Sequence, residues 1–105
     1  MLVIVGGPSG CGKSTLARHL AAKLDAEFLE GDDLYSAANV DKMSRGIPLT
    51  DEDRFDWLRE IALQGSALVH KRGIAVATCS SLKKIYRDLL RTTADVDILF
   101  VILNI

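Results

Sequence analysis

Short, almost entirely apolar runs alternate along this chain with longer segments that mix apolar and polar residues. The apolar runs have the length of strands and predict β-structure at residues 2–6, 27–30, 74–79 and 98–103. The mixed segments predict helices at residues 13–24, in part of 34–44, from 50 to about 71, and at 82–91. Because strands alternate with helices and most strands are apolar on both faces, the expected fold class is α/β, a three-layer α/β/α domain around a parallel sheet.

Two of the expected helices carry additional signals. In the first, Leu16, Leu20 and Leu24 recur at four-residue spacing and predict its buried face. The third opens with Thr50 as a candidate N-cap and Asp53 three residues later, which resembles a capping box. The inner side of that helix is expected to carry Phe55, Leu58, Ala62, Gly65, Ala67 and Val69.

Composition and charge are those of an ordinary globular protein. The 105 residues are 49% hydrophobic and 26% charged, which suits a single domain over residues 1–105. The net charge of −1 gives no electrostatic reason to expect nucleic-acid or membrane binding. The N-terminal apolar run lacks the features of a signal peptide, and Cys11 and Cys79 show no disulfide pattern. We therefore expect a soluble, cytoplasmic protein without a membrane partner.

The segment from Gly7 to Thr15 fits the phosphate-binding loop pattern G-x-x-x-x-G-K-[ST]. It follows an expected strand and opens an expected helix, which is the context that this motif requires. Its glycines let the backbone wrap around a phosphate with N–H groups pointing inward. Lys13 is then expected to reach the β- and γ-phosphates and the Ser14 hydroxyl to ligate Mg²⁺. The expected nucleotide-binding residues are Gly7, Ser9, Gly10, Cys11, Gly12, Lys13, Ser14 and Thr15.

Polar residues also follow the second and third expected strands, at Glu30–Asp33 and at Cys79–Ser81. Ligands of parallel α/β sheets bind beyond the carboxyl ends of the strands, so both groups are expected beside the phosphate-binding loop. A carboxylate there can orient or deprotonate an acceptor hydroxyl, and Asp32 is the first candidate, before Asp33.

Each of these acidic residues has an alternative interpretation. Asp32 and Asp33 can instead cap the following helix, and one can cap while the other acts in catalysis. Glu30 can hold a water molecule of Mg²⁺ and so join Ser14 as a metal-site residue, or it can be a solvated strand end. The sequence alone leaves these alternatives open.

Two familiar nucleotide-hydrolase signatures are absent from the sequence. The strand at 74–79 does not end in the aspartate that follows the apolar run of many motor and transporter ATPases. The sequence also lacks an Asn/Thr-Lys-x-Asp motif for reading guanine, which argues against a GTPase. A small-molecule kinase of the nucleoside-monophosphate-kinase type fits the motifs better.

Four segments together resemble the gluconokinase family in order and spacing. They are Gly7–Thr15, Glu30–Asp33, Lys42–Arg54 with Trp57-Leu58, and Cys79–Lys84 with Tyr86–Asp88. The last two are far more specific than the phosphate-binding loop, and the resemblance covers essentially the whole chain. It implies ATP- and Mg²⁺-dependent phosphorylation of the 6-hydroxyl of D-gluconate, a sheet with strand order second-third-first-fourth, and a homodimer.

The resemblance also implies roles for individual residues. Asp32 matches the acceptor-binding carboxylate and is the candidate base, with Lys13 as its catalytic partner on the phosphate. Arg54 resembles the residue that receives the gluconate carboxylate, for which a guanidinium fork is well suited. The alternative for Arg54 is a solvated arginine in a first helical turn, where the helix dipole opposes a cation. The other implied substrate contacts are Ser80, Ser81 and Lys84, whereas Trp57 is expected in the core.

The sequence departs from the family pattern at three places. Tyr35-Ser36 stands where the family has His-Pro, and Ser81 stands where it has alanine. Relatives also continue past the position of Ile105 with a lid, an adenine-contacting loop, a fifth strand and a helix. Two alternatives therefore accompany the gluconokinase prediction. One is a catalytically weak nucleotide-binding module with an exposed fourth strand, and the other is a kinase of another small acid or polyol such as shikimate.

Overall fold

The computed structural model describes residues 1–7, 12–80 and 82–103. Within these residues, one parallel sheet contains β1 (Leu2–Gly6), β2 (Glu27–Leu29), β3 (Ala75–Cys79) and β4 (Ile98–Ile102). The strand order is β2-β3-β1-β4. The parallel sheet and the strand order expected from the sequence are thus confirmed.

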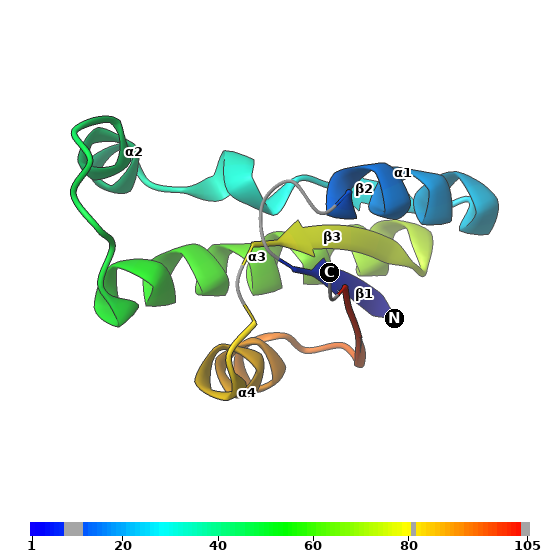
Figure 1. Cartoon of the computed structure of the whole chain (residues 1–105). Helices are drawn as coiled ribbons and strands as arrows, with labels where there is room; N and C mark the ends of the chain where they lie inside the picture. Colours follow the sequence, from blue (N-terminus) through cyan, green and yellow to red (C-terminus); the bar gives the residue numbers. More distant parts are fainter. Residues whose placement is uncertain (8–11, 81, 104–105) are drawn as a thin grey trace.

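Helices cover both faces of the sheet and complete the three expected layers (Figure 1). α1 (Lys13–Leu24) packs on one face, while α3 (Asp51–Arg72) and α4 (Lys84–Thr93) pack together on the other. A short 3₁₀ turn, η1 (Gly31–Leu34), follows β2, and α2 (Ala37–Ser44) lies beyond the carboxyl end of β3 (Figure 1). None of the helices in the described residues is long and apolar enough to cross a membrane.

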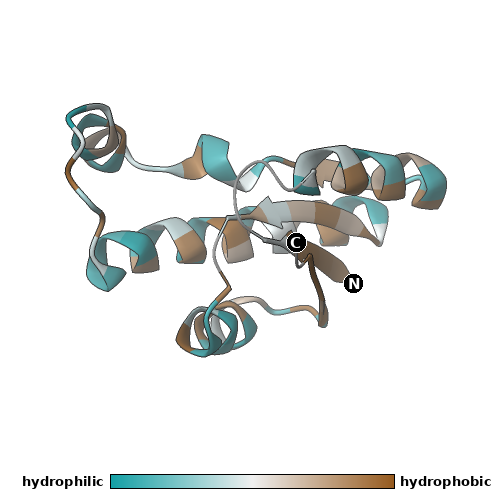
Figure 2. Ribbon diagram, viewed as in Figure 1, coloured by the Kyte–Doolittle hydropathy of each residue, from teal (hydrophilic) through white to brown (hydrophobic). Residues whose placement is uncertain are grey.

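The hydrophobic core lies in two clusters, one on each side of the sheet. Successive side chains of a strand point to opposite faces. Accordingly, Leu2 and Ile4 of β1 pack in the cluster of α3 and α4, whereas Val3 and Val5 pack against α1. In Figure 2, β1 is brown and β3 is paler, and polar residues gather on the outer sides of the helices. β1 is completely enclosed and therefore fixes the position of the loop that follows it.

The buried face of α1 differs from the one predicted from its leucines. Ala17 and Ala21 are the apolar residues that are buried, while Leu24 is 46% exposed. Alanine lets the helix axis lie closer to the sheet, so the small residues take the central positions and Leu16 and Leu20 pack at the sides. A similar correction applies to α3, in which Ala67 is exposed and Ile61 and Ser66 are buried.

The capping box at the start of α3 is confirmed. The Thr50 hydroxyl accepts a hydrogen bond from the Asp53 N–H at 3.1 Å, and the Asp53 carboxylate accepts one from the Thr50 N–H at 3.0 Å. Asp53 also joins α2 to α3, because Lys42 Nζ lies 2.9 Å from its carboxylate and the Asn39 amide donates to its carbonyl at 2.8 Å. One acidic residue therefore orders the segment between η1 and α3.

These contacts make stability depend on pH through Asp53. The Thr50 N–H and then Lys42 hold the pKa of Asp53 below its ordinary value of 3.8. A lowered pKa in the folded state stabilises the protein above the unfolded-state pKa, and the stabilisation is lost as the pH falls through the folded-state pKa. We therefore expect Asp53→Asn to lower the melting temperature at neutral pH. The difference in melting temperature between the variant and the parent chain should become smaller below about pH 4. If this difference in melting temperature were the same at pH 6 and pH 3, the ionised Asp53 carboxylate would not stabilise the protein as described.

Gly31 lies in close contact with β3, and its N–H and carbonyl groups are hydrogen-bonded to β3 and α3. Its N–H donates to Thr78 Oγ1 at 2.9 Å, and its carbonyl accepts from Trp57 Nε1 at 2.7 Å. A Cβ at this position would lie 1.9 Å from the Thr78 carbonyl oxygen. Gly31→Ala is expected to cost at least about 3 kcal/mol, the upper part of the range for overpacking.

A matched glycine variant separates crowding from backbone strain. Gly46 has φ +73°, and a Cβ there would meet nothing within 4 Å. Gly46→Ala should therefore cost only the strain of a left-handed residue, about 1–2 kcal/mol. Urea unfolding of both variants provides the comparison, and equal losses of stability would show that Gly31 is less crowded than the structure indicates.

Candidate active site

The phosphate-binding loop joins β1 to α1 at the carboxyl end of the sheet. Gly7 follows β1, and Gly12 caps α1 with φ 85°, a left-handed conformation that favours glycine. A pocket of about 220 Å³ lies at this helix N-terminus and is lined by Gly12, Lys13, Ser14 and Thr15. The remaining nucleotide-binding residues expected from the sequence, Ser9, Gly10 and Cys11, lie outside the described residues.

Lys13 is the first residue of α1 and is only 6% exposed. No described carboxylate forms an ion pair with its ammonium group, although charged groups inside proteins are normally paired. The partial positive charge of the helix N-terminus adds to that of Lys13. This end of α1 is therefore suited to an anion such as a phosphate.

Glu30 links the phosphate-binding end of α1 to the sheet. Its carboxylate accepts a hydrogen bond from the Ser14 hydroxyl at 2.9 Å and another from the hydroxyl of Thr78, a fully buried residue of β3. Arg18 lies 4.0 Å from the same carboxylate. Glu30 is thus half-buried and hydrogen-bonded to both α1 and β3. The alternative prediction, that Glu30 is a solvated strand end, is therefore wrong. Thr78 was not singled out from the sequence, and its only signal is a hydroxyl in an otherwise apolar strand.

A divalent cation here would have few protein ligands. Among the described residues, no group of three or more His, Cys, Asp or Glu side chains is arranged to hold a metal ion. Mg²⁺ commonly keeps several waters and takes one or two protein oxygens together with substrate phosphates. The Ser14 hydroxyl and the Glu30 carboxylate, which lie 2.9 Å apart, form a donor set of that kind.

Asp32 and Asp33 lie in η1 and are both exposed. Neither caps the next helix, because the hydroxyl of Ser36 caps α2 by accepting a hydrogen bond from the Asn39 N–H at 3.1 Å. The capping alternative for the two aspartates is therefore wrong. Their carboxylates remain available at the end of the sheet that carries Lys13.

Tyr35 lies among the residues expected to bind the acceptor. Its ring stacks on that of Trp57, with centroids 4.4 Å apart, and its hydroxyl lies 3.3 Å from Ser80 Oγ. Burial raises the pKa of Tyr35; the negative charge of Asp32 raises it further, whereas the positive charge of Arg54 lowers it. Ser80 is thus in contact with the Tyr35 hydroxyl, and the charges of Asp32 and Arg54 act on it. Trp57 is 1% exposed, so its predicted place in the core is confirmed.

Arg54 is held by the protein rather than solvated. It is half-buried, and its Nη1 donates a hydrogen bond to the hydroxyl of Tyr86 at 3.1 Å. This hydrogen bond is the main reason that the pKa of Arg54 is raised. Tyr86 had no assigned role in the sequence, although it lies in one of the segments that carry the family resemblance.

Of the two remaining predicted substrate residues, Lys84 is not brought into this group. Lys84 begins α4, and its ammonium pairs with Asp88 on the same helix at 2.9 Å, on an exposed surface. The neighbouring Lys83 instead reaches Asp51 at 2.8 Å. Ser81 lies outside the described residues. A substrate contact by Lys84 remains a prediction.

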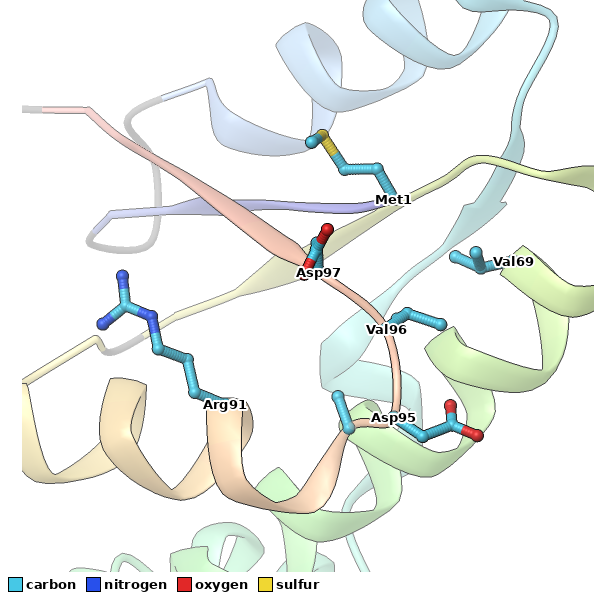
Figure 3. A pocket seen from close by; sticks show the side chains of 7 residues that line it. Met1, Val69, Arg91, Asp95, Val96 and Asp97 are labelled. Carbon is cyan, nitrogen blue, oxygen red and sulfur yellow. The ribbon is translucent and has the colours of Figure 1, made fainter.

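A larger depression, of about 610 Å³, lies elsewhere and is shown in Figure 3. Met1 on its wall precedes β1, and Val96 and Asp97 precede β4, so it lies at the amino ends of these strands. Parallel α/β sheets bind their ligands at the carboxyl ends. We therefore place the candidate site at Lys13, Glu30 and Asp32.

Comparison with known proteins agrees with this geometry. Residues 2–103 match a family model described as an AAA domain. The chain belongs to this AAA-domain family. The family assignment supports nucleotide binding by the loop at Gly7–Thr15.

Gluconokinases are among the proteins that the chain resembles. A probable gluconokinase of Saccharomyces cerevisiae is 46% identical over 99 residues, covering 88% of this chain and 51% of that protein. A thermosensitive gluconokinase of Escherichia coli is 50% identical over 88 residues, covering 84% and 47%. The crystal structure of a gluconokinase from Sinorhizobium meliloti 1021 superposes with a TM-score of 0.85 at 42% identity, covering 97% of this chain and 56% of that one. The resemblance found in the sequence is thus confirmed, and the chain spans about half the length of these relatives.

Proposed function

We propose that this chain forms the nucleotide- and acceptor-binding part of a gluconokinase, which transfers the terminal phosphoryl group of ATP to the 6-hydroxyl of D-gluconate. The observation that carries the proposal is the nearly buried ammonium of Lys13, which pairs with no carboxylate of the described residues and shares one end of the sheet with Asp32 and Arg54. The gluconokinase relatives supply the acceptor. A cytoplasmic location and a homodimer belong to the same proposal.

On the nucleotide side, the residues present fit the triphosphate of ATP with Mg²⁺. Lys13 and the N-terminus of α1 would bind phosphate oxygens, and Ser14 with Glu30 would hold the cation. Bound Mg²⁺ would neutralise charge on the phosphates. The buried position of Lys13 excludes water from its ammonium and strengthens its attraction for that charge.

On the acceptor side, each of the residues gathered there would bind a different part of a sugar acid. Arg54 would bind the carboxylate through two parallel N–H donors. Ser80 and the Tyr35 hydroxyl would hydrogen-bond to the hydroxyls of the sugar chain. Asp32 would orient the reacting hydroxyl and accept its proton. An acid at one end and a hydroxyl at the other then fix which oxygen is phosphorylated.

The test is ADP formation by the 105-residue chain with Mg-ATP, with and without D-gluconate, using Lys13→Ala as the blank. Turnover that requires gluconate and disappears in the blank is the expected result. Nucleotide binding without gluconate-dependent turnover would assign this chain the role of a nucleotide-binding module. A panel that includes shikimate and several sugar acids tests the acceptor, since the Tyr35 hydroxyl contacts Ser80, one of the residues that would bind it.

A further inference from the structure

Arg54 occupies an unfavourable position that requires an explanation. It lies in the first turn of α3, where the helix dipole disfavours a cation. Three acidic residues precede it in the same turn, but its guanidinium donates to a neutral group, the hydroxyl of Tyr86, at 3.1 Å. Tyr86 comes from α4, 32 residues later in the chain, and is fully buried. The contact therefore fixes Arg54 relative to a second helix.

The hydroxyl of Tyr86 is itself fixed by Asp51. Tyr86 donates its proton to Asp51 Oδ1, and the same carboxylate oxygen pairs with Lys83 Nζ at 2.8 Å. Lys83 and Tyr86 lower the pKa of Asp51, so this carboxyl remains an ionised acceptor at neutral pH. A phenol has a single proton to donate. Since Asp51 takes that proton, the lone pairs of the Tyr86 oxygen face Arg54.

The tyrosine ring is also held in place. Phe55 packs edge-on against it, with ring centroids 6.3 Å apart and an interplanar angle of 87°. Lys83 Nζ lies 5.0 Å from the ring centroid. A phenol that is buried, packed and hydrogen-bonded on two sides is a rigid support.

The hydrogen bond to Tyr86 involves only one nitrogen of the Arg54 guanidinium. Arginine carries five N–H donors in a planar fork. In the part of the chain that the structure describes, Tyr86 is the hydrogen-bond partner of Arg54, through Nη1 alone. As far as the described residues go, the other donors of the fork remain available for a planar anion, and their direction is set by the bond to Tyr86.

We propose that Tyr86 is a positioning residue that aims Arg54 at the carboxylate of the acceptor, and that Asp51 acts through Tyr86 by fixing the direction of its proton. This inference rests on the proposed function for the identity of the acid. The arrangement would make the enzyme selective for acceptors with a carboxylate at the end opposite the reacting hydroxyl. Neither Tyr86 nor Asp51 needs to touch the substrate.

The first test uses Tyr86→Phe, which removes the hydroxyl and keeps the ring packing. We expect the KM for D-gluconate to rise by roughly tenfold or more, the loss typical of a hydrogen bond to a charged group. The kcat and the KM for ATP should change little. Arg59→Gln, which removes an exposed arginine of the same helix, is the matched control. An unchanged gluconate KM, or an equal fall in kcat, would overturn the proposal.

The second test asks whether Asp51 acts through Tyr86. Asp51→Asn should raise the gluconate KM in the same direction. The double variant Asp51→Asn/Tyr86→Phe should be no worse than Tyr86→Phe alone, because residues in one hydrogen-bond network are not additive. If the increases in gluconate KM from the two single variants multiply in the double variant, Asp51 acts independently of Tyr86. That result would reject the proposal that Asp51 acts through Tyr86.

A third measurement is independent of the acceptor. Rotation of the Arg54 guanidinium about its Nε–Cζ bond can be followed by ¹⁵N exchange NMR without any ligand. We expect slow rotation in the parent chain and at least about tenfold faster rotation in Tyr86→Phe, as the hydrogen bond to a charged group is lost. Arg59→Gln, which leaves the Tyr86 hydroxyl in place, is again the control. If the parent chain does not turn over gluconate, the proposed function fails, while equal rotation in parent and Tyr86→Phe would refute the positioning role.

Discussion

Replacing Lys13 with alanine is expected to lower gluconate-dependent ADP formation by roughly 10²–10³-fold, the range for losing one preorganised contact to developing charge. The ammonium of Lys13 is nearly buried at the N-terminus of α1 and has no described carboxylate as a partner. An electrostatic contact is stronger where water is excluded. Steady-state kinetics at saturating Mg-ATP and D-gluconate gives the measurement.

The same variant has a second expected effect that distinguishes function from folding. Without nucleotide, Lys13→Ala should melt at the same temperature as the parent or higher, because it removes a buried charge for which the described part of the chain supplies no counter-charge. Lys23→Ala, in the exposed last turn of the same helix, is the control. If Lys13→Ala melted well below the parent and Lys23→Ala, the loss of activity would be explained by unfolding. That result would no longer support a role of Lys13 in phosphate binding.

Asp32→Asn is expected to lower kcat by roughly 10²–10⁴-fold, the contribution of a positioned general base. Asparagine keeps the size of the side chain and can still hydrogen-bond, but it cannot accept a proton at neutral pH. Because Asp32 is exposed in η1, the substitution should leave the melting temperature nearly unchanged. Nucleotide affinity, measured by calorimetry, should also be unaffected.

Asp33 is the natural comparison for Asp32. Both residues lie in η1, both are exposed, and neither caps α2. Asp33→Asn is expected to change kcat by less than about tenfold, since one positioned carboxylate suffices to accept the proton of the acceptor hydroxyl. A larger loss from Asp33→Asn than from Asp32→Asn would transfer the role of the base to Asp33.

Much of the fold follows from local patterns in the sequence. The alternation of apolar runs and mixed segments predicted the parallel sheet, and the pair Thr50 and Asp53 predicted the start of α3. These features depend on neighbouring residues, which a sequence displays directly. The order of the strands was less accessible, and it came from the family resemblance.

The orientation of α1 could not be read from its leucines. Leu16, Leu20 and Leu24 have the correct period, but the face that is buried is centred on Ala17 and Ala21. Hydrophobicity alone favours the larger side chains. How closely a helix approaches a sheet is decided by tertiary packing, where a small residue has an advantage that periodicity does not reveal.

The candidate site was predicted as a set of residues rather than as a network. Lys13, Asp32 and Arg54 could be selected because their motifs are contiguous in the chain. The contacts that hold the site join distant positions, such as Thr78 to Glu30 and Tyr86 to Asp51. A single sequence contains no direct signal for such pairs.

The hydrogen bond between Glu30 and Ser14 has a consequence for how the two proposed binding sites would influence one another. The Glu30 carboxylate touches Ser14 on the nucleotide side, and the next two residues of the chain lead to Asp32 on the acceptor side. A ligand that binds the Ser14 hydroxyl would break its hydrogen bond to Glu30, so occupation of the proposed nucleotide site would act on the segment that carries Asp32, the proposed base. The two substrates would then raise or lower one another's affinity, and thermodynamic linkage requires that the factor be the same in both directions.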